Sequence, residues 1–150
     1  MPKLQRFKID EQKERTGVPV LFPLDTGYIR LYVRRADNNR DFERRVQELR
    51  RPFLRRIRTG KISQGELNRL TATAMAGTVL VGWDKDGEYG MEDEGGPVPF
   101  SIEKAVELLT DSSIPEFFRF VDAESVNPEN FAECVPAEEE AALQEDSAKN

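Results

Sequence analysis

The stretch of sequence that decides the fold class is VPVLFPLDTGYIRLYVRR, residues 18–35. Apolar side chains take every second position on both sides of a turn-forming PLDTG segment at 23–27; they are Val18, Val20 and Phe22 before it, and Ile29, Leu31 and Val33 after it. This alternation is typical of half-buried strands. We therefore predict an N-terminal β-hairpin, which must pack on helices because an isolated hairpin is only marginally stable.

The segment after the hairpin changes to helical spacing. Between residues 40 and 58 the apolar residues recur three or four positions apart; they are Phe42, Val46, Leu49, Phe53 and Ile57. Asn38-Asn39 can cap this helix, Pro52 should kink it, and Gly60 should end it. Five arginines fall on the opposite face at 100° per residue; they are Arg40, Arg44, Arg51, Arg55 and Arg58.

Four further helical segments are expected along the rest of the chain. Ser63 and Glu66 fit a capping box for a helix that we expect to run through Val81 and to end at Gly82. Ser101 can cap a short helix up to Leu109, Pro115 sits at an early position of an aromatic-rich helix, and Asn127-Pro128 can start a last turn. Among Phe117, Phe118 and Phe120, one ring should be exposed or covered by a partner.

These elements predict an α+β fold that is mainly α, with the N-terminal β-hairpin packed on a bundle of about four or five helices. With 150 residues the chain is long enough for one domain with its own core. We expect a flexible leader over residues 1–16, a single globular domain over 17–133, and an acidic, disordered tail over 134–150. The N-terminus lacks the apolar core of a signal peptide, and no apolar run approaches the roughly 20 residues of a membrane span.

Composition argues against enzymatic chemistry and against a metal site. The chain has no histidine and one cysteine, Cys134, which removes the usual general base, the His-activated nucleophiles and most zinc sites. The acidic loop that begins at Asp84 fails as an EF-hand, because its sixth and twelfth positions are Tyr89 and Gly95. We expect no catalytic residue, no metal and no cofactor, and a solvated surface loop over residues 84–96.

Charge is divided sharply between the two halves of the chain. Residues 1–69 contain 18 Lys and Arg against nine Asp and Glu, whereas residues 70–150 contain four against 19. A basic helix face could bind phosphates, but the acidic half would repel a polyanion and no aromatic–basic interleaving is present. An acidic protein partner is the alternative that we favour, and the candidate contacts are Arg44, Arg51, Arg55 and Arg58.

Several short motifs follow one another in the second half of the chain. Residues 78–109 read TVLVGWDKDGEYGMEDEGGPVPFSIEKAVELL, in which LVGW is followed by an acidic turn, GGPVPFS and a helical segment that ends in a double leucine. This order resembles the tail assembly chaperones of long-tailed bacteriophages, which have "LVGW", an acidic turn, "G-x-P-V/I-P-F/Y-S" and a short helix ending in a double leucine. The segment RRADNNRDFERRVQELRRPFLRRIRTGKI at 34–62 and the FFRFV run at 117–121 also resemble the family. The likeness covers roughly residues 17–132, although GVPVLFPLDTGYIR is longer than the usual form.

This resemblance implies a non-enzymatic role in the host cytoplasm. Such chaperones bind and solubilise the tape-measure protein, help recruit tail-tube subunits around it, and are absent from the mature virion. Self-association is a further expectation. Two alternatives stay open: a structural minor component of the tail or head–tail junction, and a nucleic-acid-binding protein.

Overall fold

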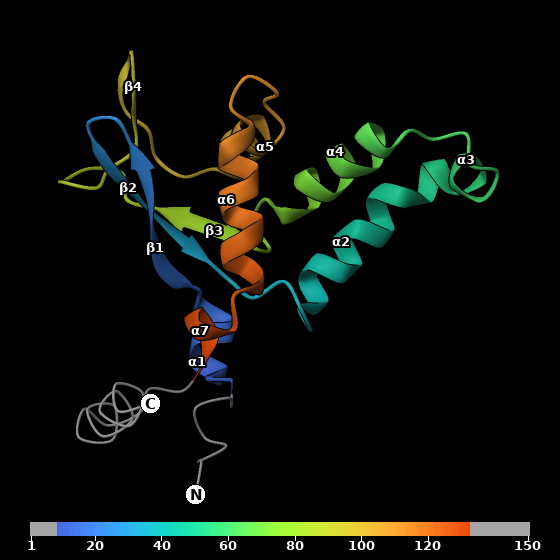
Figure 1. Ribbon diagram of the computed structural model, residues 1–150, viewed down its shortest axis with the longest axis horizontal. Coiled ribbons are helices and arrows are strands. Elements are labelled where there is room, and N and C mark those ends of the chain that lie inside the picture. The colour runs from blue at the N-terminus through green and yellow to red at the C-terminus, as the bar shows by residue number, and fades with distance from the viewer. Residues whose placement is uncertain (1–8, 133–150) are drawn as a thin grey trace, which may run out of the picture.

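Helices and a small antiparallel sheet make up the described part of the chain, residues 9–132 of the computed structural model (Figure 1). The elements in chain order are α1 (Glu11–Thr16), β1 (Val18–Leu24), β2 (Gly27–Val33), α2 (Arg40–Arg50), the 3₁₀ turn η2 (Arg51–Phe53), α3 (Leu54–Arg58), α4 (Gln64–Met75), β3 (Leu80–Trp83), β4 (Glu92–Asp93), β5 (Gly96–Pro97), α5 (Ile102–Leu109), α6 (Pro115–Val126) and α7 (Pro128–Phe131). The predicted α+β class is confirmed, with helices predominating.

The predicted hairpin is present as two neighbouring strands of a three-stranded sheet in the order β1-β2-β3. Strands β1 and β2 pair antiparallel from Val18 opposite Val33 to Leu24 opposite Gly27. Residues 25–26 form the turn that joins them. The predicted inward face is confirmed, because Ile29, Leu31 and Val33 are all buried. The loop is shorter than the several residues that we expected, because the strands stay paired up to Leu24 and Gly27.

The third strand is a correction to the sequence-based expectation. We predicted a helix through Val81, but α4 ends at Met75 and residues 80–83 instead pair with β2. Gly77 has φ +84°, which breaks the helix, and its N–H donates to the carbonyl of Leu80 at 2.9 Å. The free edge of β2 thereby gains a partner, and this long-range pairing overrides the local helical spacing.

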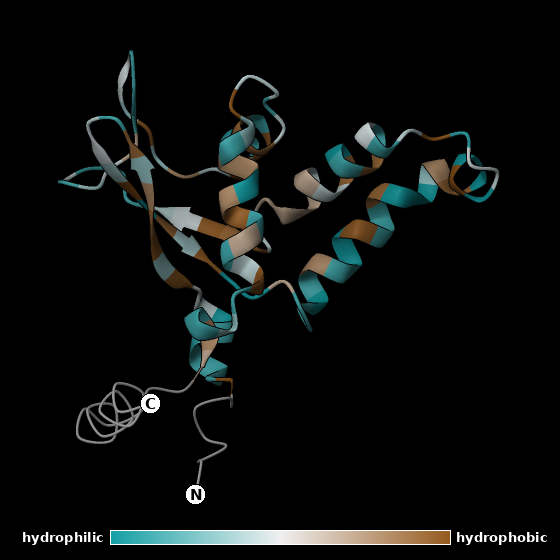
Figure 2. Cartoon of the chain, in the orientation of Figure 1, coloured by the Kyte–Doolittle hydropathy of each residue, from teal (hydrophilic) through white to brown (hydrophobic). Residues whose placement is uncertain are grey.

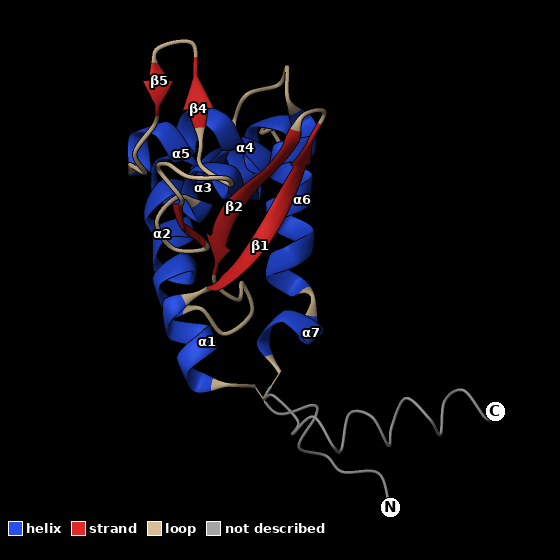
Figure 3. Cartoon of the chain, turned by 90° about the vertical axis from the view of Figure 1, so that its left-hand side faces the viewer, coloured by secondary structure: helices blue, strands red, loops and turns tan. Residues whose placement is uncertain are grey.

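The core lies between this sheet and the C-terminal helices. Helix α6 packs across β1 and β2, while the short α5 packs between α6 and α4 (Figures 1 and 3). The ring of Phe22 on β1 makes edge contacts with Phe117 and Phe120, at centroid distances of 5.4 and 5.2 Å. Of the three phenylalanines of α6, Phe117 is buried and Phe118 and Phe120 are half-buried, so none of the three is fully exposed.

The two ends of the described segment lie together. Ile9 pairs with Ala132 as an isolated β-bridge, and the N–H of Asp10 donates to the carbonyl of Phe131 at 2.8 Å. Asp10 also caps α1 by accepting from the N–H of Gln12 at 2.9 Å. We expected a leader without structure up to residue 16; instead, residues 9–16 form this bridge and helix α1, and residues 1–8 and the expected tail lie outside the described residues.

A helical hairpin extends away from the sheet, and we call it the arm (residues 40–75: α2, η2, α3 and α4). Helix α2 packs mainly on α4, and the two run beside each other on the side of the molecule opposite the sheet (Figure 1). Within residues 9–132 no helix is both long and apolar enough to cross a bilayer.

Candidate partner-binding surface

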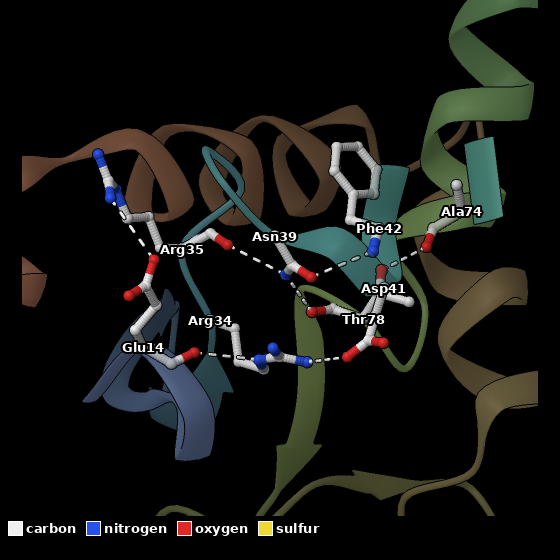
Figure 4. A network of polar contacts seen from close by, with 8 residues as sticks. All are labelled: Glu14, Arg34, Arg35, Asn39, Asp41, Phe42, Ala74 and Thr78. Atoms are coloured by element: carbon white, nitrogen blue, oxygen red, sulfur yellow. Dashed lines mark hydrogen bonds and ion pairs between the residues drawn. The ribbon is translucent and has the colours of Figure 1, made fainter. Parts of the chain in front are cut away.

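Asn39 fixes the base of the arm. Its side chain is 3% exposed and accepts from the N–H of Phe42 at 3.1 Å, which confirms the predicted N-cap of α2. Its amide nitrogen donates to the carbonyls of Arg35 at 3.0 Å and Thr78 at 2.7 Å (Figure 4). One side chain therefore ties the start of α2 to the chain after β2 and to the turn before β3.

A group of ionic contacts joins the same region to α1. The guanidinium of Arg34 donates to the carbonyl of Glu14 at 3.1 Å and pairs with the carboxylate of Asp41 at 3.1 Å (Figure 4). Arg35 lies 3.5 Å from the carboxylate of Glu14. The arm therefore leaves the body from a base that is held on two sides, and its direction is fixed by the fold.

The sequence also encodes the bend and the turn of the arm. Pro52 lies in the 3₁₀ turn η2 between α2 and α3, as the missing N–H of proline predicts. Gly60, with φ +67°, follows α3, and Ser63 and Glu66 form a complete capping box at the start of α4. Arg56 pairs with Glu66 at 2.8 Å and so links α3 to α4 beside the turn.

The apolar stripe of the arm stays only partly covered. On α2, η2 and α3 all residues of the stripe are half-buried; they are Phe42, Val46, Leu49, Phe53 and Ile57. Leu67 and Leu70 on α4 are half-buried too. No residue of α2, η2 or α3 is buried. Two helices alone cannot enclose a stripe of this width, because a buried helix face needs neighbours on both sides. Figure 2 shows these apolar segments along the arm.

The four arginines selected from the sequence line this arm. Arg44 lies on α2, Arg51 in η2, and Arg55 and Arg58 on α3, and all four side chains are exposed. Within residues 9–132 their guanidinium groups form no hydrogen bond or ion pair, whereas their neighbours Arg45 and Arg56 pair with glutamates. The arm as a whole has ten Lys and Arg against four Asp and Glu. Its unpaired positive charge is therefore available to an acidic partner.

A groove beside the arm adds two basic residues that the sequence reasoning missed. It has a volume of about 470 Å³ and lies between α4 and the segment from the end of α5 to the start of α6. Arg69 of α4 and Arg119 of α6 both line it, together with Ala72, Leu109 and Phe118. Arg69 and Arg119 are fifty residues apart, and the packing of α5 against both α4 and α6 brings them to one groove, so no local pattern marks them.

The acidic loop is anchored by Asp84 and is not arranged as a metal site. Its carboxylate accepts from the hydroxyl of Tyr32 at 2.7 Å and pairs with Arg30 at 3.2 Å. The guanidinium of Arg30 also lies 4.8 Å from the ring centre of Tyr89. Among residues 9–132 no group of three or more Cys, Asp and Glu side chains is placed to hold a metal ion.

The contact between Tyr32 and Asp84 should make the free energy of unfolding fall at alkaline pH. The pKa of Tyr32 lies above its ordinary value of 10.0, mainly because its hydroxyl donates to the Asp84 carboxylate and also because it is partly buried. Folding raises this pKa, so the hydrogen bond contributes fully to the free energy of unfolding below about pH 10, and this contribution is lost as the pH rises through the raised pKa.

We expect Tyr32→Phe to lower the free energy of unfolding by about 1 kcal/mol at pH 8 and by less at pH 11. Urea unfolding of both proteins at the two pH values measures this, and an equal cost at both would contradict it.

The comparisons with known proteins place the chain in a phage context. No curated protein and no solved structure matches it. Over residues 36–144, however, the sequence matches a family described as YdaY prophage protein. The matched range contains the arm, strand β3, the acidic loop and helices α5 to α7. Because the match spans more than half of the chain, this protein belongs to the YdaY prophage protein family.

Proposed function

We propose that this protein is a phage tail assembly chaperone whose arm binds amphipathic helices of the tape-measure protein. The observation that carries the proposal is the arm itself, with its half-exposed apolar stripe and its unpaired arginines. Membership of a prophage protein family supports the phage setting. The motif order at 34–62 and 78–121 supports the chaperone role by resemblance.

A third helix is the partner that best fits the arm. Two antiparallel helices with a partly covered apolar stripe form a groove into which an amphipathic helix can lay its own apolar face. The arginines lie on the face opposite the stripe, so they would contact acidic residues of the partner that reach around the arm outside the groove. A tape-measure protein is long and helix-rich, so many copies of this chain would bind along it, and repeated weak contacts add up to tight binding.

The remaining parts of the proposal follow from the same role. A chaperone of this kind acts in the host cytoplasm, holds the tape-measure protein in solution, helps recruit tail-tube subunits, and leaves before the virion is complete. It needs no cofactor and no catalytic residue, since its work is binding.

Co-expression with the tape-measure protein of the same phage tests the proposal. The long protein should become soluble and co-purify when this chain is present. If it stays insoluble and unbound, the chaperone proposal is wrong.

Charge reversal on the arm gives the residue-level prediction. The variant with Arg44, Arg51, Arg55 and Arg58 all changed to Glu should lose binding of the tape-measure protein, because each guanidinium is replaced by a group that repels an acidic partner. The double variant Arg44→Glu/Arg51→Glu should weaken binding at least about tenfold. Far-UV circular dichroism should be unchanged, because all four side chains are exposed and form no hydrogen bond or ion pair within residues 9–132.

A matched control separates position from net charge. Arg15 on α1 and Lys85 in the acidic loop are exposed and lie outside the arm. The double variant Arg15→Glu/Lys85→Glu changes the net charge by the same amount and should bind as the wild type does. Equal losses in the two double variants would reject the arm as the binding surface.

The net positive charge of the arm keeps nucleic acid as a second candidate. A nucleic-acid binder would be retained on DNA with a steep dependence on salt, and the same reversal of four arginines would remove that retention. A structural tail component would instead be detected by mass spectrometry of purified particles.

A further inference from the structure

An apolar hollow lies at the end of the molecule away from the tip of the arm. It has a volume of about 370 Å³ and is formed by the β1–β2 turn, Met91 and the segment that joins α5 to α6. Its apolar lining consists of Phe22, Pro23, Leu24, Ile29, Met91, Leu108, Ile114 and Phe117. Leu24 is 47% exposed and Ile114 is 37% exposed, so an apolar rim faces solvent there. A partner that fills the hollow would remove this apolar rim from water. We call it the end hollow.

The surroundings of the end hollow are acidic. Its charged lining residues are Asp25 and Glu116, both exposed, and neither carboxylate is paired within residues 9–132. Directly after Met91 the exposed residues 92–94 read Glu-Asp-Glu. No lysine or arginine lines the hollow. A segment that enters it should therefore be apolar at its centre and basic at its edges.

The tip of the arm has that combination of properties. Leu54, at the start of α3, is 44% exposed, and Phe53 and Ile57 beside it are half-buried. Arg55 and Arg58 flank Leu54, and both are exposed and unpaired within the described residues. The arm tip, residues 53–61, has three Arg and one Lys and no acidic residue.

We propose that the arm tip of one copy of this chain docks into the end hollow of a second copy. Leu54 and its neighbours supply apolar surface to the hollow, while Arg55 and Arg58 approach Asp25 and Glu116 of the other copy. The arm tip lies at one end of the molecule and the β1–β2 turn toward the other (Figure 1), so the arm tip cannot reach the end hollow of its own copy. The contact is head-to-tail, and such contacts repeat into rows or rings.

This inference does not depend on the proposed function, although a row of copies would suit a long partner. Arg55 and Arg58 take part in both proposals, whereas Arg44 and Arg51, on the stem of the arm, take part only in the binding of the tape-measure protein. Self-association can be measured with the purified chain alone. Its failure would leave the tape-measure experiment untouched, and the reverse also holds.

Sedimentation velocity of charge-swapped variants tests the contact. The wild type should associate as protein concentration rises, and added salt should weaken the association. The tip variant Arg55→Glu/Arg58→Glu and the end variant Asp25→Lys/Glu116→Lys should each associate at least about tenfold more weakly, because like charges then meet across the interface. An equimolar mixture of the two variants should associate again, since each restores the complementary charge of the other.

A control variant and a fold measurement make the outcome decisive. Asp122→Lys/Glu129→Lys changes two exposed acids on α6 and α7 and should associate as the wild type does. Circular dichroism spectra of all variants should superimpose, because none of the changed side chains is buried. A wild type that stays monomeric at low salt, variants that behave like the control, or a mixture that does not associate would each overturn the proposal.

Discussion

Replacing Trp83 with alanine should lower the free energy of unfolding by about 4 kcal/mol, the largest effect that we expect from one substitution. The indole is 6% exposed and ends strand β3, where Trp83 pairs with Leu31. Its Nε1–H donates to the carbonyl of Val98 at 2.8 Å, and its ring meets Phe100 edge-on at 4.7 Å. The alanine variant loses packing, an aromatic contact and a buried hydrogen bond together.

Guanidinium unfolding monitored by far-UV circular dichroism measures this effect, since the chain has one tryptophan and the variant has none. Trp83→Phe is the matched comparison. It keeps an aromatic ring against Phe100 but removes the donor to Val98, and we expect it to cost about half as much. A loss below about 1 kcal/mol for the alanine variant would contradict the central place that we give to this side chain.

Asn39→Ala should cost about 3 kcal/mol, the second largest expected effect. The substitution removes the N-cap of α2 and leaves the carbonyls of Arg35 and Thr78 without their donor. Because the same side chain joins the arm to the turn before β3, the arm should also become more mobile at its base. Hydrogen exchange of α2 amides should therefore rise more than that of β2 amides.

Asn39→Asp separates the two roles of this side chain. Aspartate keeps an acceptor for the N–H of Phe42 and suits the N-terminus of a helix, but it cannot donate to the two carbonyls. We expect it to be less stable than the wild type, since a carboxylate would then face two carbonyl oxygens. If the aspartate variant were as stable as the wild type, the cap alone would explain the role of Asn39.

Local chemistry made much of the fold predictable. The hairpin and its inward face follow from the alternation on both sides of the PLDTG segment, and the start, bend and end of the first long helix follow from Asn39, Pro52 and Gly60. The caps at Ser63 and Ser101 are present as the sequence indicated. Each of these signals acts within a few residues, so the sequence alone is enough to find it.

Contacts between distant segments were the ones that sequence reasoning missed. The first two residues of strand β3 fit a helix, because the apolar and small residues before them recur at helical spacing: Leu67, Leu70, Ala74, Gly77 and Val81. Pairing with the free edge of β2 decides otherwise. Helix α1 has no buried residue, and it is held by the cap at Asp10 and the bond to Phe131. The exposed positions of Arg44 and Arg51 could be predicted from the helical spacing of the apolar residues. The groove that Arg69 and Arg119 share could not, because it forms only when the helices pack together.

The bridge between Ile9 and Ala132 has a consequence for synthesis on the ribosome. Ile9 and Asp10, the first residues that the structure describes, pair with Ala132 and Phe131, more than one hundred residues later. Strands β1 and β2 can pair early, but their covering helix α6 and this closing bridge emerge late in translation. The arm, by contrast, is a local helical hairpin whose two halves emerge together and can form first. A nascent chain would therefore present its basic helices while its sheet is still uncovered, and the body would close only after Ala132 has left the ribosome.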